Sequence, residues 1–445
     1  MYSDDIERLL SAGKIKTGDG VSVTFDGQII EGVLMPRPDV GDSGILVVKR
    51  KDGYNMGIRY GKGFSVKKTG ERREHFSFPK RSAPKGAGLP RISMIYTGGT
   101  IGSKVDYASG GVYMLTKPEE LLHDVPELEG IASIDIHDLM SIASEDMTHA
   151  EWAKIADETA KALNGGAKGV VITHGTDTMH YTSAALSFML KGLNAPVVLT
   201  GAQRSSDRGS SDAFVNLICS AQIASKSDVA EVGICMHNTS SDKENVFIRG
   251  TKARKMHTSA RDAFKPINSL PICRADASGT IEYIGEYRHA EAGSKKKVSA
   301  ETKFEEKVAI VKTHPNSDPG VIEYYTGKGF KGLIIEGTGL GHVPTTTSKK
   351  GMSWIEGIKR AIDEGVVVGI TSQCINGRVN ENVYRNLRTL RGAGAIFCED
   401  MMSEVAYVKL GWLLGSMGKA EAAGLLNKNI AGEISERRDA DWFTE

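Results

Sequence analysis

The stretch that decides the fold is RISMIYTGGTIG, at residues 91–102. Its apolar run ISMIY predicts a short buried strand, and the pair Gly98-Gly99, flanked by Thr97 and Thr100, predicts a tight loop where that strand ends. Open parallel sheets bind ligands beyond the carboxyl ends of their strands, and glycine there allows close approach of the backbone. Taken alone, however, the motif is explained more simply as a turn that ends a strand.

A second loop of the same kind follows the strand GVVIT, where residues 173–178 read THGTDT. Asp177 or Thr178 alone is most simply a cap for the helix predicted from TSAALSFML. Two such loops after two parallel strands, however, converge on one crevice. A threonine hydroxyl there can act as a nucleophile once a base accepts its proton. The pair of loops therefore favours a functional site over two unrelated turns.

Two charged segments are candidates to complete such a site. Residues 250–258, GTKARKMHT, contain Lys255, and a lysine beside a buried carboxylate can serve as a general base. The alternative is a surface loop with three solvated cations. Residues 144–147, SEDM, precede a helix predicted from HAEWAKIADETAKALN, with a capping box from Thr148 to Glu151. The alternative for SEDM is acidic charge placed at the positive end of that helix.

The whole chain divides by pattern into three zones. Its 445 residues are too many for one core, because cores divide beyond roughly 250–300 residues. Residues 1–80 predict a small β-barrel of short strands, and residues 81–90 a linker with glycine and proline. Residues 91–286 predict a larger α/β lobe with a doubly wound, mostly parallel sheet. After the polar connecting segment 287–306, residues 307–445 predict a smaller C-terminal α/β lobe.

Composition argues against several classes of protein. Lysine plus arginine (56) and aspartate plus glutamate (55) nearly cancel, whereas a protein that binds nucleic acid alone usually has a basic excess. The five cysteines form no C-x-x-C pair and the histidines no H-x-x-x-H pair, so we expect free thiols and no bound metal. No phosphate-loop spacing supports nucleotide binding. Because we find no signal peptide and no apolar run near about 18 residues, we expect a cytoplasmic protein.

Together, these segments resemble the bacterial-type L-asparaginase family in order and spacing. TGGTIGS is similar to its first signature, THGTDTM to its second, SEDM to its substrate-binding loop, and the stretch from Lys255 to Phe264 to its lysine segment. The leading β-rich zone, GAQRSSDRGSSDAFVNL, NGRVNENVY and CEDMMSEVAYVKLGWLLG further resemble the D-subunit family of archaeal glutamyl-tRNA(Gln) amidotransferases. This resemblance covers essentially the whole chain and implies an asparaginase-like fold of two α/β lobes after the small β-barrel domain.

The resemblance also implies roles for individual residues. Thr100 is similar to the attacking hydroxyl of the first signature, and Thr176, Asp177 and Lys255 are similar to the second threonine and its activating pair. Such a pair is chemically sensible, because an aspartate and a lysine beside a hydroxyl supply a proton acceptor without histidine. Which threonine attacks first stays open.

Further residues are assigned to the substrate by the same resemblance. Ser144 and Glu145 are similar to residues that bind the α-amino and α-carboxylate groups, and the backbone N–H of Ala202 is a candidate donor to the oxyanion. A tyrosine on a flap is expected to cover the first threonine. The spacing from that threonine favours Tyr113, and the local motif VDY favours Tyr107.

The function implied by the resemblance is that of a glutaminase subunit. It hydrolyses glutamine to glutamate and ammonia, and an E-type partner subunit uses the ammonia to convert Glu-tRNA(Gln) to Gln-tRNA(Gln). The implied assembly is a heterotetramer of two D and two E subunits, with a homodimer formed through the asparaginase-like domains. This chain would hold no cofactor; the complex would use ATP and Mg²⁺ in the partner subunit, which would also make most of the tRNA contacts.

Two alternatives stand beside this hypothesis. A free-standing L-asparaginase has no evident need for the leading β domain. A catalytically idle scaffold has no need for the intact set Thr100, Thr176, Asp177 and Lys255. The preference for glutamine over asparagine stays open. Because an enzyme that transfers ammonia should not leak it, we expect weak glutamine hydrolysis in the absence of the partner.

Overall fold

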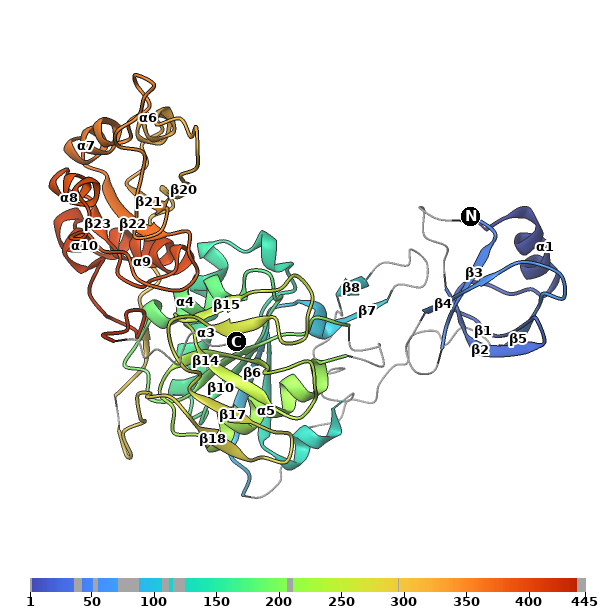
Figure 1. The fold of residues 1–445 in the computed structure, drawn as a ribbon. Coiled ribbons are helices and arrows are strands. Elements are labelled where there is room, and N and C mark those ends of the chain that lie inside the picture. Colours follow the sequence, from blue (N-terminus) through green and yellow to red (C-terminus); the bar gives the residue numbers. More distant parts are fainter. Residues whose placement is uncertain are drawn as a thin grey trace.

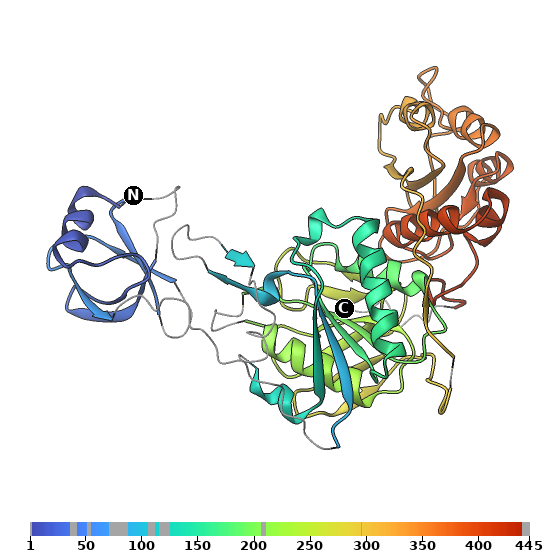
Figure 2. The same ribbon diagram turned by 180° about the vertical axis from the view of Figure 1, so that it is seen from behind.

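The computed structural model describes residues 2–35, 42–50, 55–70, 88–105, 112–114, 125–205, 211–294 and 296–437 of the chain. Three units follow one another along it (Figure 1). The larger α/β lobe lies between the small β domain and the C-terminal lobe, as the view from behind also shows (Figure 2). Most of the predicted linker 81–90 falls outside the described residues. Within the described ranges, no helix has the length and apolar content of a membrane span.

The first unit is a small β domain with one helix against it. Its elements are α1 (Asp4–Ala12), β1 (Gly20–Phe25), β2 (Gln28–Leu34), β3 (Ile45–Lys49), β4 (Asn55–Arg59) and β5 (Ser65–Gly70). The strands are antiparallel in the order β4-β3-β2-β1-β5. Val21 and Val23 of β1, and Leu46 and Val48 of β3, are buried at alternate positions, and Ile6 of α1 packs on them. The small β domain predicted as a barrel is present, and its five strands form an antiparallel sheet with β4 and β5 at the two ends of the strand order.

The larger lobe is built on one eight-stranded sheet. Its strands are β6 (Arg91–Tyr96), β9 (Ser133–Asp138), β10 (Val170–Thr173), β12 (Val197–Thr200), β13 (Val232–His237), β14 (Asn245–Arg249), β17 (Cys273–Ala275) and β18 (Ile281–Tyr283). They lie in the order β18-β17-β14-β13-β12-β10-β6-β9. The pairs from β9 to β13 are parallel, whereas β14, β17 and β18 are added antiparallel at one edge. The sheet is therefore mostly parallel, as predicted.

Helices cover both faces of this sheet. They are α3 (His149–Asn164), α4 (Met179–Met189) and α5 (Ala213–Lys226). Successive residues of β10 face opposite ways: Ile172 packs with α3 and α4, and Val171 packs with α5. Every residue of β10 and β12 is buried, so both faces of the sheet must be covered by helices, which gives the doubly wound arrangement. The capping box predicted for α3 is present, with Glu151 accepting from the backbone N–H of Thr148 at 3.0 Å.

The smaller C-terminal lobe repeats this plan. Its parallel strands, in the order β20-β21-β22-β23, are β20 (Val308–Lys312), β21 (Gly332–Gly337), β22 (Val367–Ser372) and β23 (Ile396–Phe397). Its helices are α6 (Gly320–Gly327), α7 (Ile355–Asp363), α8 (Arg385–Gly392), α9 (Ser403–Ser416) and α10 (Lys419–Leu425). Leu333 of β21 packs with α6, α7 and α8, and the next residue, Ile334, packs with α9 and α10. Both faces of this sheet are therefore also covered.

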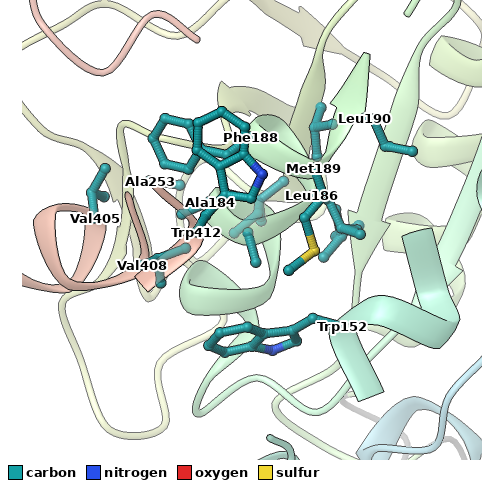
Figure 3. Packing of buried hydrophobic residues seen from close by; sticks show 14 of the residues in the cluster. Trp152, Ala184, Leu186, Phe188, Met189, Leu190, Ala253, Val405, Val408 and Trp412 are labelled. Atoms are coloured by element: carbon teal, nitrogen blue, oxygen red, sulfur yellow. The ribbon is translucent and has the colours of Figure 1, made fainter. Parts of the chain in front are cut away.

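The two α/β lobes share one hydrophobic core. Phe188 of α4 stacks on Trp412 of α9, with ring centroids 5.9 Å apart, and Val405 and Val408 of α9 extend the same cluster (Figure 3). Ala253 joins it from a short strand of the larger lobe (Figure 3). Because close-packed interiors transmit displacement, α9 and the larger lobe are held in a defined relation to each other.

Short elements complete the lobes. They are the antiparallel pairs β7 (Ser103–Val105) with β8 (Val112–Met114), β11 (Leu190–Lys191) with β19 (Ser299–Ala300), and β15 (Ala253–Lys255) with β16 (Phe264–Pro266), and the 3₁₀ turns η1 (Thr100–Gly102), η2 (Pro126–Gly130) and η3 (Ser144–Asp146). All five cysteines are free, and only Cys374 is exposed. The structure therefore has the free thiols that the sequence predicted, and four of them are buried.

Candidate active site

Four loops meet at the carboxyl edge of the larger sheet. The strands β9, β6, β10 and β12 are parallel neighbours, and their last residues are in register: Asp138 with Tyr96, Tyr96 with Thr173, and Thr173 with Thr200. The loops that follow contain SEDM, TGGT, HGTDT and GAQR. Because these loops leave the sheet at the same level, the segments predicted to form a site are brought to one place.

The first two loops touch through glycine. Gly99 has a φ of +88°, and a Cβ built on it would lie 2.5 Å from Gly175 N and 2.6 Å from the carbonyl carbon of His174. Only glycine fits there, because an added carbon would meet backbone atoms that cannot move aside. Thr97 Oγ1 also donates to the carbonyl oxygen of Thr173 at 2.7 Å. Thr100, the next residue after Gly99, is therefore held beside the second loop.

The SEDM segment packs against the other side of the second loop. A Cβ on Gly175 would lie 2.8 Å from Ser144 Cβ, and Thr178 Oγ1 donates to the carbonyl oxygen of Ser144 at 2.6 Å. Thr178 occupies the N-cap position of α4 but makes no side-chain capping bond, so the simple capping role considered for it is wrong. Ser144 is buried and Glu145 is exposed.

The lysine segment supplies the central contact of the site. Lys255, the last residue of β15, places Nζ 2.9 Å from Thr176 Oγ1 and 2.5 Å from Asp177 Oδ1. The Lys255 side chain is 9% exposed and that of Asp177 is 66% exposed. An ammonium group donates both hydrogen bonds, whereas the neutral amine can accept the threonine proton. The arrangement therefore places a hydroxyl beside an amine and the amine beside a carboxylate, which is a geometry that can activate a nucleophile.

Two of the histidines near these loops have structural roles. His174 is fully buried, with Nδ1 2.6 Å from the Gly175 carbonyl oxygen and Nε2 2.8 Å from Thr182 Oγ1. Burial lowers its pKa to about 4, so it is neutral near neutral pH and braces the second loop. His257 Nδ1 accepts the backbone N–H groups of Ser259 and Ala260, at 3.0 and 2.9 Å, and fixes the turn after the lysine segment.

The remaining predicted residues are placed as follows. Ala202 is buried directly after β12, and a Cβ on its neighbour Gly201 would lie 3.0 Å from Thr176 Cγ2. Tyr113 lies on β8, where its backbone pairs with Lys104. Tyr107 is outside the described residues. Within the ranges that the structure describes, no group of three or more histidine, cysteine, aspartate or glutamate residues is arranged to hold a metal ion.

Two cations of the lysine segment are more important than the sequence indicated. The alternative considered for this segment is a surface loop with solvated cations. That interpretation is wrong for Lys252 and Arg254, because each forms an ion pair. Lys252 Nζ lies 2.7 Å from Asp400 Oδ2, and Arg254 Nη1 lies 2.5 Å from Glu404 Oε1. The signal that identifies them is the alternation of side chains along a strand, combined with the acidic residues of CEDMMSE.

Comparison with known families defines the class of protein. The family "Asparaginase, N-terminal" matches residues 91–288, and "Glutaminase/Asparaginase C-terminal domain" matches residues 307–423. The L-asparaginase from Thermococcus kodakarensis superposes with a TM-score of 0.69 at 27% identity, covering 78% of this chain and 100% of that one. L-asparaginase I from Vibrio cholerae gives 0.68 at 28% identity, covering 78% and 99%. These matches place the two α/β lobes in the asparaginase-type amidohydrolases.

The leading domain narrows the family further. Residues 15–68 match "GatD N-terminal domain". The D subunit of glutamyl-tRNA(Gln) amidotransferase from Pyrococcus furiosus is 47% identical, covering 98% of this chain and 99% of that protein. The D subunits from Methanopyrus kandleri and Methanothermobacter thermautotrophicus are 44% and 42% identical, each over 99% of this chain and over 96% and 99% of their own lengths. The chain belongs to the D-subunit family of glutamyl-tRNA(Gln) amidotransferases.

Proposed function

We propose that this chain is the glutaminase subunit of a tRNA-dependent amidotransferase. It hydrolyses glutamine to glutamate and ammonia, and an E-type partner subunit uses the ammonia to convert Glu-tRNA(Gln) to Gln-tRNA(Gln). The observation that carries the hydrolytic half is Lys255 Nζ within hydrogen-bonding distance of both Thr176 Oγ1 and Asp177 Oδ1. Membership in the D-subunit family supports the second half, because its relatives are named as subunits of an amidotransferase.

The chemistry proceeds through an ester on threonine. A threonine oxygen attacks the side-chain carboxamide carbon of the substrate, and its proton passes to neutral Lys255. Lys255 takes this proton directly if Thr176 attacks, and through the Thr176 hydroxyl if Thr100 attacks. The C–N bond then breaks, the nitrogen takes up a proton, and ammonia leaves. Water hydrolyses the ester, releasing glutamate and returning the hydroxyl to threonine.

The substrate is held by the surrounding loops. Ser144 and Glu145 bind the α-amino and α-carboxylate groups, and Asp177, whose side chain is 66% exposed, offers its second oxygen to the ammonium. The backbone N–H of Ala202 faces the oxyanion that forms during attack. Tyr113 or Tyr107 covers the first threonine. Exclusion of water by this cover strengthens each of these electrostatic contacts.

The assembly and its cofactors belong to the same proposal. Two D-type and two E-type subunits form the complex, and the D-type subunits pair through their asparaginase-like domains. This chain holds no cofactor, and ATP and Mg²⁺ act in the partner subunit, which also makes most of the tRNA contacts. The nearly balanced charge, 56 cations against 55 anions, supports that division of labour. Five free cysteines support a reducing compartment, the cytoplasm.

A second candidate function is hydrolysis of free asparagine. The solved structures that it resembles are named L-asparaginases, and they match 78% of this chain, which leaves room for the leading domain. That domain favours the amidotransferase, because a free-standing asparaginase of this fold is complete without it.

The test follows the amide nitrogen. The complex reconstituted with the E-type subunit, ATP, Mg²⁺ and glutamylated tRNA receives glutamine labelled with ¹⁵N in its side-chain amide. We expect the label in tRNA-bound glutamine. With Lys255→Ala the label should not transfer, while added ammonium chloride should still support amidation, because only ammonia production is lost. Transfer of label that is unaffected by Lys255→Ala would refute the proposed site.

A further inference from the structure

The segment that carries Lys255 is tied to the C-terminal lobe at three points. Thr251 Oγ1 donates to the carbonyl oxygen of Ala431 at 3.1 Å. Lys252 pairs with Asp400 at 2.7 Å, with side chains 2% and 5% exposed. Arg254 pairs with Glu404 of α9 at 2.5 Å, with side chains 28% and 9% exposed. The segment is part of the larger lobe, and these three contacts attach it to the smaller lobe as well.

Strand geometry directs the side chains of this segment in opposite directions. Residues 253–255 form β15, which pairs antiparallel with β16, and side chains alternate along a strand. Arg254 accordingly reaches Glu404 in α9, while Lys255 reaches Thr176 and Asp177. One rigid strand thus connects a C-terminal carboxylate to the site, and a rotation or shift of β15 about Arg254 would move Lys255.

The acidic partners are themselves fixed. Asp400 accepts from the backbone N–H of Ser435 at 3.1 Å, and its carbonyl oxygen accepts from Asn268 Nδ2 at 3.0 Å. Glu404 lies in the first turn of α9, whose apolar residues pack in the core shared by both lobes. The C-terminal lobe therefore presents both carboxylates from a rigid frame.

Stability alone does not account for these pairs. Burial lowers the pKa of Lys252 and raises the pKa of Glu404, in each case against the pull of the opposite charge. Glu404 Oε2 is buried and makes no hydrogen bond. Buried ion pairs often stabilise a fold less than apolar residues of the same volume. They are directional, however, and a pair at 2.5 or 2.7 Å fixes position more strictly than an apolar contact does.

We infer that Lys252 and Arg254 are positioning residues for Lys255, and that Asp400 and Glu404 of the C-terminal lobe hold the lysine against Thr176. The kinetic part of this inference rests on the proposed function of Lys255, and the geometric part does not. It makes the smaller lobe part of the site, although the smaller lobe supplies none of the reacting groups assigned above.

The kinetic test breaks the Arg254–Glu404 pair in the full-length chain. Arg254→Met and the isosteric Glu404→Gln should each lower kcat for amide hydrolysis about 10- to 100-fold with KM within about twofold, because small misplacement of a catalytic group is costly. Arg254→Lys keeps the charge and should recover much of kcat. Glu404→Gln also serves if Arg254→Met does not fold.

A matched ion pair provides the control. Lys68 of β5 pairs with Asp19 at 3.0 Å in the small β domain, and its side-chain exposures of 28% and 3% resemble the 28% and 9% of Arg254 and Glu404. Lys68→Met should leave kcat unchanged at temperatures below the melting points of both variants. If Lys68→Met lowers kcat to the same degree as Arg254→Met, the effect of Arg254 is general destabilisation and the inference is wrong.

A crystal structure tests the geometry without reference to activity. In Arg254→Met or Glu404→Gln, Lys255 Nζ should no longer lie within hydrogen-bonding distance of Thr176 Oγ1. A lysine that keeps its 2.9 Å contact in these variants overturns the inference, whatever the rates. If the wild-type chain hydrolyses neither amide, the proposed function fails, and this structural comparison still decides whether the lobes position Lys255.

Discussion

Lys255 Nζ lies 2.9 Å from Thr176 Oγ1, although 79 positions of the chain separate the two residues. The contact exists because β10 ends at the site while β15 crosses beside α4 and brings its last residue to the same edge. In the function proposed above, this lysine, with an aspartate on its other side, accepts and returns the hydroxyl proton.

The first prediction concerns this lysine. Lys255→Ala should lower kcat for amide hydrolysis by about 10²–10⁴, the usual contribution of a general base. Lys265→Ala is the matched control: Lys265 lies on the adjoining strand β16 and pairs with Asp262 at 3.0 Å. It should keep nearly full activity, because Lys265 contacts none of the assigned site residues and a partly exposed ion pair is worth little. Initial rates of ammonia release compare the two, and equal losses would contradict the assignment.

The two threonine hydroxyls give a second prediction. Thr100→Val and Thr176→Val keep the side-chain shape and remove the oxygen, so each should lower kcat by about 10³ or more without unfolding the chain. Thr159→Val is the control, because Thr159 Oγ1 is buried on α3 without a hydrogen-bond partner and its loss should not reduce activity. Mass spectrometry of acid-quenched enzyme should locate the acyl group on one of the two threonines. Full activity in either site variant removes that threonine from the mechanism.

A third prediction compares two glycines with positive φ, of which only Gly99 lies against another loop. Gly99 and Gly166 have similar φ values, +88° and +93°, but a Cβ would meet backbone within 2.7 Å at Gly99 and nothing within 4 Å at Gly166. Gly166→Ala should therefore cost about 1 kcal/mol of stability and leave kcat unchanged. Gly99→Ala should force the first two loops apart and abolish activity. Thermal melts and initial rates measure the two effects, and similar kinetics for both variants would show that the close approach is unimportant.

The buried histidines predict how stability depends on pH. Burial lowers the pKa of His174 to about 4 and that of His180 to about 3, from an ordinary 6.5. At a pH between the folded-state pKa and 6.5, the unfolded chain binds more protons than the folded chain. The free energy of unfolding is therefore highest above about pH 6.5 and falls as the pH drops toward 4. Each histidine should remove roughly 2 kcal/mol between about pH 7 and about pH 5.

Urea unfolding at those two pH values measures this loss. His174→Gln should start less stable, because it gives up the bond to Thr182, but it should lose less of its stability on acidification than the wild type. An identical pH dependence in both proteins would mean that His174 is not the titrating group.

Sequence patterns predicted the strands and loops of the site because these depend on local chemistry. The run ISMIY and the glycine pair after it specify a buried strand and a tight turn without reference to the rest of the chain. The same is true of the capping box from Thr148 to Glu151, which forms as predicted. The antiparallel strands β14, β17 and β18 depend instead on long-range pairing, which short apolar runs do not reveal.

Contacts between residues far apart in the sequence could not be predicted from local sequence patterns. Lys252 reads as a solvated cation until its partner Asp400, 148 positions further along the chain, is known. Thr178 reads as a helix cap until Ser144 supplies a better acceptor for its hydroxyl. In both cases a distant partner overrides the local preference of a polar side chain, because most polar groups that lose contact with water find a hydrogen-bond partner within the protein.

The most direct measurement of the central claim is ammonia release from glutamine and from asparagine, first by this chain alone and then with the E-type subunit and glutamylated tRNA. We predict weak glutamine hydrolysis by the chain alone, a sharp rise when partner and charged tRNA are added, and loss of the rise in Lys255→Ala. Strong asparagine hydrolysis by the chain alone, indifferent to partner and tRNA, would contradict the account and indicate a free-standing asparaginase.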